Sequence, residues 1–161
     1  MSITVRPACT DDAQVIGRLA REFAQYLHDL GDPTEFKLTA ETFLRDGFGN
    51  QSAFSAIVAV DDDRVTGYLL YHFGYDSDAA ARILHIVDLY VDREARNRGA
   101  GTALMAAAAG IADKTGAQEL IWSVFKANSL AASFYENLGA QRITEVFFMK
   151  LKPNALKSDT A

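Results

Sequence analysis

The chain has 161 residues, of which 49% are hydrophobic and 23% are charged, and its formal net charge is −5. This length and composition are typical of one soluble globular domain, and they exclude a chain that is disordered throughout, a collagen-like chain and a coiled-coil rod. The negative charge repels phosphate backbones and therefore disfavours nucleic acid as a partner.

Cys9 is the only cysteine, which excludes an intrachain disulfide and a multi-cysteine zinc site and indicates a reduced, cytoplasmic setting. The first residues lack the basic and apolar regions of a signal peptide. No apolar run approaches the ~18 residues of a membrane span. We therefore expect a cytoplasmic protein that has no membrane partner.

The first half of the chain predicts two helices and four strands. Residues 3–7 form a short strand, and a helix over residues 10–30 follows, with Thr10 as its cap. A second helix covers residues 39–48 and is capped by Thr39. Residues 54–60 and 65–73 read as a hairpin, and residues 83–91 as the most apolar strand.

The second half alternates helices and strands. We expect a helix over residues 101–114, a strand over 119–125, a helix over 129–138 that ends at Gly139, and a last strand over 142–151. This order predicts an α/β (α+β) fold with a single mixed, mostly antiparallel, twisted sheet and helices on both faces. One domain would cover residues 1–152, and residues 153–161 would be a flexible tail.

The loop after the most apolar strand has the composition of a phosphate-binding site. Arg96 and Arg98 supply cationic side chains, and Gly99 and Gly101 lead directly into a helix. Glycines allow a close approach of the backbone, and the N–H groups at a helix start attract anions. The alternative is a plain loop with a glycine-assisted helix start. A dinucleotide-binding fold fits poorly because its fingerprint needs three glycines.

The pattern Arg96-x-x-Gly99-x-Gly101 resembles the coenzyme A pyrophosphate loop of the GNAT superfamily of N-acetyltransferases. The resemblance extends to three further segments: Arg6-Pro7-Ala8, Gly67-Tyr68-Leu69-Leu70-Tyr71 and residues 128–139. Within the superfamily the chain is most similar to the diamine and thialysine acetyltransferase branch. That similarity is carried by Asp88-Leu89-Tyr90-Val91 and by Phe134-Tyr135-x-x-x-Gly139-Ala140.

The resemblance implies a GNAT-like fold that binds acetyl-coenzyme A (acetyl-CoA), direct attack by the acceptor without a covalent enzyme intermediate, no required metal, and a homodimer. It implies that Tyr135 is the general acid at the coenzyme A sulfur and that a backbone N–H near Leu89 polarises the thioester carbonyl. The cofactor would contact Leu89, Tyr90, Val91, Arg96, Asn97, Arg98, Gly99, Ala100, Gly101, Thr102, Asn128 and Tyr135.

Asp88 is a carboxylate inside an apolar strand, so it is either the base that deprotonates an amine or a structural hydrogen-bond acceptor. The three histidines, His28, His72 and His85, are scattered and suggest no metal site. In an unbroken strand His85 and Asp88 would lie on opposite faces, and a bulge would change this.

The polyamine-acetylating relatives carry glutamates where this chain has Leu27 and Val87, which makes polyamine specificity doubtful. We expect an acetyl-CoA-dependent N-acetyltransferase that acts on a primary amine of a small molecule, such as a small amine or an amino acid. Acceptor contacts are expected from Tyr26, Leu27, Val87, Asp88 and Ser123. Two alternatives remain open, namely a non-catalytic acyl-CoA-binding sensor or interaction module, and a protein or peptide N-acetyltransferase.

Overall fold

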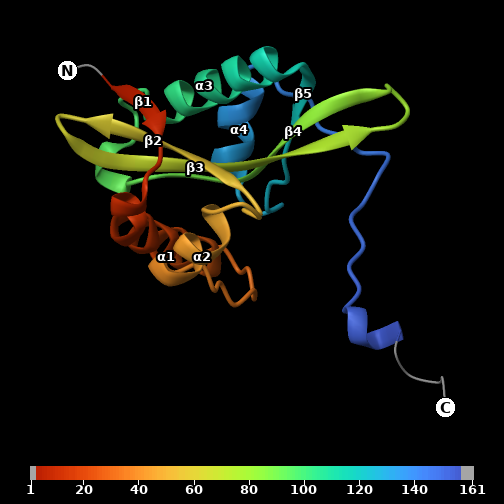
Figure 1. Ribbon diagram of the computed structural model, residues 1–161, viewed down its shortest axis with the longest axis horizontal. Coiled ribbons are helices and arrows are strands. Elements are labelled where there is room, and N and C mark those ends of the chain that lie inside the picture. The colour runs from red at the N-terminus through yellow and green to blue at the C-terminus, as the bar shows by residue number, and fades with distance from the viewer. Residues whose placement is uncertain (1–2, 157–161) are drawn as a thin grey trace. The chain divides into compact units, whose positions relative to one another are not determined.

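The computed structural model describes residues 3–156, and the chain divides into two compact units, Met1–Ser129 and Leu130–Ala161. The first unit holds one five-stranded sheet whose strands are ordered as in the sequence (Figure 1). Its strands are β1 (Thr4–Pro7), β2 (Ser55–Asp61), β3 (Arg64–Asp76), β4 (Ala81–Val91) and β5 (Ala117–Ile121). The first four pair antiparallel and β5 joins β4 in parallel, which confirms the predicted mixed sheet.

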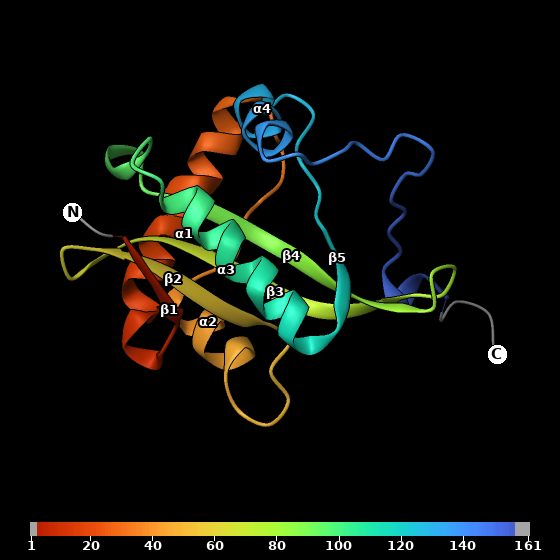
Figure 2. The same ribbon diagram turned by 90° about the horizontal axis from the view of Figure 1, so that it is seen from above.

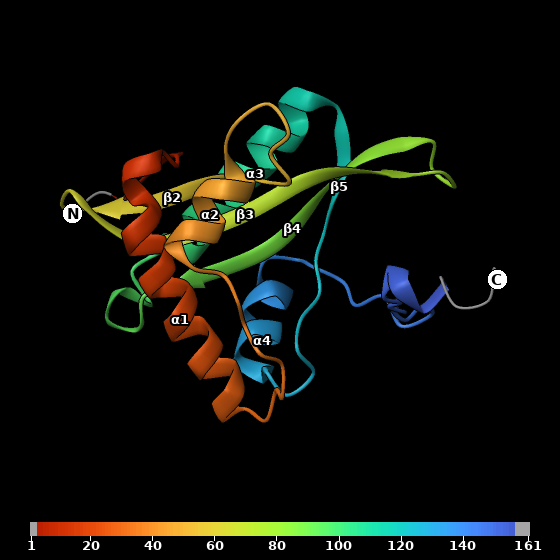
Figure 3. The same cartoon turned by 60° about the horizontal axis from the view of Figure 1, so that its bottom comes forward.

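Helices cover both faces of this sheet, as predicted. The helices of the first unit are α1 (Ala13–Asp29), α2 (Ala40–Gly47) and α3 (Ala100–Thr115), with short 3-10 turns η1 (Thr10–Asp12) and η2 (Arg93–Ala95). Figure 3 shows α1 and α2 together on one face, and Figure 2 shows α3 lying across the other. Among helices of the described residues, none is both long and apolar enough to cross a membrane.

The two helix starts in the first half differ in how they are capped. Thr39 caps α2 as predicted, since its hydroxyl accepts from the Thr42 N–H. The prediction for Thr10 was wrong. The Asp12 carboxylate instead accepts from the Cys9 N–H over 2.8 Å and from Arg6 over 2.7 and 2.9 Å. Arg6 lowers the pKa of Asp12, and the pair fixes the chain between β1 and α1.

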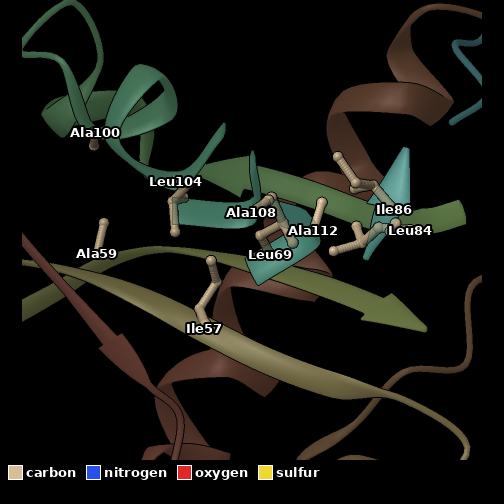
Figure 4. Packing of buried hydrophobic residues seen from close by; sticks show 10 residues of the cluster. Ile57, Ala59, Leu69, Leu84, Ile86, Ala100, Leu104, Ala108 and Ala112 are labelled. Carbon is tan, nitrogen blue, oxygen red and sulfur yellow. The ribbon is translucent and has the colours of Figure 1, made fainter. Parts of the chain in front are cut away.

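Two apolar clusters hold the layers together. On one face Ala100, Leu104, Ala108 and Ala112 recur every four residues and form a stripe along α3 (Figure 4). Small alanines let the helix lie close to the sheet residues beneath it, which are Ile57, Ala59, Leu69, Leu84 and Ile86. On the other face α1 and α2 pack Ile16, Leu19 and Phe43 against Val58, Tyr68, Leu70 and Tyr90.

The largest difference from the predicted strands in the first unit concerns β5. It ends at Ile121, although a strand was expected to continue to residue 125. β5 pairs with β4 only from Arg82 to His85, and the chain then leaves the sheet. A strand persists only where a neighbour takes up its N–H and C=O groups, so this departure ends it.

The second unit contains all of α4 (Ser129–Asn137) except its first residue, and a short 3-10 helix, η3 (Pro153–Leu156). Gly139, two residues after the end of α4, has a φ of 95°, as a C-terminal capping glycine does. The strand expected over residues 142–151 is absent from the described structure. Apolar alternation predicted it, but alternation alone does not form a strand without a hydrogen-bonding partner. The expected tail begins in η3, and residues 157–161 lie outside the described residues.

Candidate active site

The last six residues of β4 form an open edge in the described sheet. β3 accompanies β4 from Ala81 to Val91, whereas the pairing of β5 ends at His85. The segment from Ile86 to Val91 therefore has a strand neighbour on one side only. Outward N–H and C=O groups of such an edge are available to an extended ligand. Leu89, Tyr90 and Val91, which were predicted to contact the cofactor, lie on this edge.

The predicted phosphate cradle is the turn that connects η2 to α3. Asn97 and Gly99 adopt φ values of 62° and 93°, and α3 begins at Ala100. The Ala103 N–H donates to the Gly99 carbonyl over 2.9 Å, so the N–H groups of residues 100–102 precede the helical hydrogen bonds. A Cβ placed on Gly99 would meet no atom within 4 Å, so the space beside this backbone is open. The cradle fits a phosphate group.

The two arginines of the cradle have different partners. The guanidinium of Arg96 lies over the rings of Tyr26 and Tyr90, 5.1 and 5.2 Å from their centroids. Its Nε donates to the Val91 carbonyl over 3.1 Å. Arg98 lies 3.7 Å from the buried carboxylate of Asp61. Arg96 is therefore held against the end of β4, and its charge is fixed beside the cradle.

A hydrogen bond joins α1 to the segment that precedes α4. The hydroxyl of Tyr26 donates to Oδ1 of Asn128 over 3.0 Å, and Asn128 is only 7% exposed. Together with the contacts of Arg96, this bond brings four predicted site residues into one cluster, formed by Tyr26, Tyr90, Arg96 and Asn128. They come from α1, β4, the cradle and the chain after β5.

A bulge in β4 decides which face Asp88 occupies. Ile86 pairs with Tyr71 and Asp88 pairs with Leu70, so Val87 is an extra residue. Leu84, Ile86 and Leu89 pack in the α3 cluster. Since neighbouring side chains alternate, His85 and Asp88 both lie on the face of Tyr90, toward α1 and α2. The bulge considered from the sequence is thus present, and it places His85 and Asp88 on one face.

The surroundings of Asp88 suit proton transfer near neutral pH. Burial raises the pKa of its carboxyl to about 6. Tyr68 lies on the same face and is fully buried, and its hydroxyl has no hydrogen-bond partner in the described structure. Burial raises the pKa of Tyr68, and the negative charge of Asp88 raises it further. A carboxylate with this pKa is a competent general base.

The histidine rings of His72 and His85 lie 4.7 Å apart between centroids. Burial, and then His72, lowers the pKa of His85. In the described part of the chain no group of three or more metal-ligating side chains is found.

The remaining predicted residues differ in their exposure to solvent. Val87 is 43% exposed and Ser123 is exposed, so both can meet a ligand from solvent. Leu27 is only 6% exposed and belongs to the interior of the first unit. Tyr135 lies on α4 in the second unit, half-buried, with its ring 5.1 Å from that of Phe134. Its role at the sulfur stays a prediction.

Sequence reasoning missed two groups near the site. Tyr68 was not singled out as a site residue, and its pairing with Tyr90 lies between β3 and β4, which were not predicted as a hairpin. The buried Asp92 was also missed. It accepts from the Glu94 N–H and lies 3.4 and 3.6 Å from Arg18 and Arg64, which anchors the start of the cradle. Because these arginines come from distant segments, no local pattern could reveal them.

The sequence model of the acetyltransferase (GNAT) family matches residues 18–140. The chain belongs to this family. It is 33% identical over 151 residues to a thialysine N-epsilon-acetyltransferase from Bos taurus, an alignment covering 89% of this chain and 86% of the relative. An L-ornithine N5-acetyltransferase from Arabidopsis thaliana is 32% identical over 99 residues, covering 62% and 43% of the two chains.

Among solved structures, an integron cassette protein from the mobile metagenome of V. cholerae superposes with a TM-score of 0.76 at 26% identity. The superposition covers 98% of this chain and 96% of the other. These matches confirm the predicted family, its diamine and thialysine branch, and the predicted fold. The GNAT family transfers acetyl groups from acetyl-CoA to amines, so the chain is an N-acetyltransferase.

Proposed function

We propose that this acetyltransferase acetylates the side-chain primary amine of a small amino acid, with Asp88 as the general base. The observation that carries the proposal is the position of Asp88: a half-buried carboxyl of pKa about 6 on the last part of β4, where β5 no longer pairs. The donor would lie along that edge, so the acceptor amine would reach the thioester from the face of Asp88.

The cradle would bind the pyrophosphate of acetyl-CoA. Backbone N–H groups of Gly99, Ala100, Gly101 and Thr102 would donate to it, and the N-terminal dipole of the 16-residue α3 would favour its charge. Asn97 supports the turn through its positive φ. Arg96 and Arg98 would add positive charge on either side. The open space beside Gly99 supports this close approach.

The outward backbone groups of this edge, which are those of Leu89 and the N–H of Val91, would hold the thioester arm as a neighbouring strand does. An N–H of this edge would donate to the thioester oxygen and stabilise the negative charge that develops there during attack. This role requires a backbone N–H that makes no hydrogen bond within the sheet. Such a group is available because β5 stops pairing with β4 after His85.

Asp88 would remove the proton that makes the acceptor amine unreactive. A lysine-like amine has a pKa of about 10.4, and its deprotonation at pH 7 costs about 4.6 kcal/mol. Burial of the amine beside Asp88 lowers that cost, and a carboxyl of pKa about 6 is ionised and ready to accept at pH 7. Tyr135 would supply a proton at the leaving sulfur, and Asn128 would contact the cofactor beside Tyr26.

An amino acid fits the described acceptor side better than a polyamine does. A polyamine has a second ammonium that needs a carboxylate partner, but Val87 supplies none and Leu27 is buried. Two relatives are named for thialysine and L-ornithine, which are amino acids with a side-chain primary amine. Tyr26, Val87 and Ser123 would line the acceptor side of the site.

The test is an assay of a panel of amines in which turnover is measured as the release of thiol from acetyl-CoA. Thialysine, ornithine and lysine should be turned over with higher kcat/KM than spermidine or putrescine, and mass spectrometry should place the acetyl group on the side-chain nitrogen. Binding of acetyl-CoA without turnover of any amine would contradict the proposed activity and favour the non-catalytic acyl-CoA-binding sensor. Turnover of peptides alone would point to a protein acetyltransferase. The exposed free thiol of Cys9 agrees with the cytoplasm as the proposed compartment.

A further inference from the structure

Two histidines face each other across β3 and β4, one step along the sheet from Asp88. His72 pairs directly with His85 on these neighbouring strands, and their ring centroids are 4.7 Å apart (Figure 3). The next pair on the same face is Leu70 with Asp88. Side chains on one face of a strand recur every two residues, so about 6.8 Å of strand separates the two pairs. The histidine pair and the proposed general base therefore share one stretch of surface.

The ring nitrogens of this pair lack the partners of purely structural histidines. Nδ1 of His85 is buried and has no hydrogen-bond partner within residues 3–156. Buried polar atoms in folded proteins are nearly always hydrogen-bonded, so an exception favours a functional role. Nδ1 of His72 lies 3.3 Å from the Phe73 carbonyl oxygen. A carbonyl only accepts, so this nitrogen carries a hydrogen, and Nε2 of His72 becomes a second donor when the ring is protonated.

The charge of the pair favours an anion as its ligand. Burial, and then the neighbouring His72, lowers the pKa of His85. A carboxylate beside both rings would oppose these effects, because it stabilises the positive charge that a protonated ring carries. An ammonium group would add a like charge and would be repelled. The pair therefore suits a carboxylate better than an amine.

A ligand can reach the pair from solvent. His72 is exposed and His85 is half-buried. A hollow of about 410 Å³ borders His72 where β2 begins, and small-molecule sites span about 300–1,000 Å³. The hollow is lined by Ser52, Ala53, Phe54, Ser55, His72 and Phe73. Its two serine hydroxyls add hydrogen-bonding groups beside the histidines.

The distance between the histidine pair and Asp88 matches the length of an amino acid that carries a side-chain amine. In extended ornithine, lysine or thialysine the side-chain nitrogen and the carboxylate carbon are about 6–8 Å apart, given bond lengths of about 1.5 Å. The two pairs on the sheet are separated by about 6.8 Å. An amine at Asp88 therefore puts the carboxylate of such an acceptor within reach of the histidines.

We propose that His72 and His85 bind the α-carboxylate of the acceptor amino acid while its side-chain amine lies at Asp88. This assignment rests on the proposed function and names the groups that select an amino acid. A diamine of the same length would bring a second ammonium to the histidines, where it has no carboxylate partner. The pair thus rejects diamines as well as attracting amino acids.

The test compares lysine with lysinamide, which differ only in the carboxylate. The wild-type enzyme should prefer lysine by kcat/KM. His72→Leu and His85→Leu should each lower this preference about tenfold or more, as loss of one charge-assisted hydrogen bond does. The kcat/KM for lysinamide should change less than about threefold. His72→Arg keeps a cation at this position and should keep the preference. His28→Leu, at another exposed histidine, is the matched control and should leave the preference unchanged.

The outcomes separate this subsite from the proposed function. Equal kcat/KM values for lysine and lysinamide in the wild type would overturn the subsite. So would an unchanged preference for lysine in both leucine variants, once circular dichroism shows that they are folded. In either case acetylation of the amino acid would still stand. Failure of the wild type to acetylate any amino acid would overturn the proposed function and the subsite together.

Discussion

The hydroxyl of Tyr26 and Oδ1 of Asn128 are 3.0 Å apart, although 102 residues separate them in the sequence. The same tyrosine ring lies under the guanidinium of Arg96. One side chain of α1 therefore supports both the cradle and the segment that leads into α4, and its two contacts can be removed separately.

Tyr26→Phe should lose the hydrogen bond and keep the ring beneath Arg96. We expect the free energy of unfolding to fall by about 1 kcal/mol, with the KM for acetyl-CoA changed less than threefold. Tyr26→Leu removes the ring as well, and an exposed cation–π contact is worth about 0.5–1 kcal/mol. Its KM should rise several-fold beyond that of Tyr26→Phe. Urea denaturation and steady-state kinetics measure the two effects, and equal KM values for the two variants would contradict the role of the ring.

Gly101→Glu should place a carboxylate at the start of α3, where the pyrophosphate would bind. Calorimetry should show severe loss of acetyl-CoA binding with an unchanged circular dichroism spectrum. Gly110→Glu is the matched control, because Gly110 lies on the same helix and a Cβ there meets no atom within 4 Å. It should bind normally and stabilise the helix slightly. Normal acetyl-CoA binding by a folded Gly101→Glu variant would contradict the assignment of the cradle as the pyrophosphate-binding site.

Asp88→Asn should lower activity and raise stability at neutral pH. The carboxyl has a pKa of about 6 in the folded chain against 3.8 unfolded, so the folded state holds the proton more tightly. Its contribution to stability is present below pH 3.8 and is lost as the pH rises through 6. At pH 7.5 the variant should therefore gain up to about 3 kcal/mol, and at pH 4 the gain should vanish.

The activity of the same variant should fall about 10²–10⁴-fold, the range of general base catalysis. The wild-type kcat/KM should rise with pH, with an inflection near 6 that Asp88→Asn abolishes. Asp113→Asn, at an exposed position of α3, should leave both the pH profile and the stability unchanged. Wild-type activity in the Asp88→Asn variant would contradict the role of general base and favour a structural hydrogen-bond acceptor.

Tyr135→Phe should lower kcat about 10²–10⁴-fold, as loss of a general acid does, with little change in acetyl-CoA affinity. Tyr75→Phe is the control, since Tyr75 is 68% exposed at the end of the β3–β4 hairpin. Rapid-quench measurement of the chemical step decides the outcome. A wild-type rate in Tyr135→Phe would assign the proton at the sulfur to another group.

Val87→Glu should increase the preference for spermidine over the best amino acid substrate. One charge-assisted contact is worth about 1.5–3 kcal/mol, so the ratio of kcat/KM values should shift roughly ten- to a hundredfold. Val87 is exposed, so the variant should fold. Leu27→Glu should instead destabilise the chain, because Leu27 is buried. A wild-type enzyme that prefers spermidine a hundredfold would contradict the proposed acceptor.

Local patterns predicted most of the fold and the place of the cradle. Helix periodicity, the Thr39 cap and the glycines before α3 are all encoded by neighbouring residues, and each agrees with the structure to within a few residues. The burial of Leu27, the direction of Arg96 and the anchoring of Asp92 depend on partners far away in the sequence. The prediction of a strand over 142–151 was wrong for a related reason. Alternation is a local pattern, and a strand also needs a pairing partner that local pattern does not predict.

The short pairing of β4 with β5 has a consequence for the order in which the chain folds. β2, β3 and β4 follow one another as antiparallel neighbours, so their contacts are local, whereas β5 can join only after α3 has crossed the sheet. Pairing of parallel strands that are far apart in the sequence is slow, because the chain loses the entropy of closing the loop before the strand contacts contribute any favourable free energy. The pairing of β5 with β4 is thus the last to form in the described sheet. Amides of β5 should exchange with solvent through a partial opening that leaves the β2–β4 meander intact.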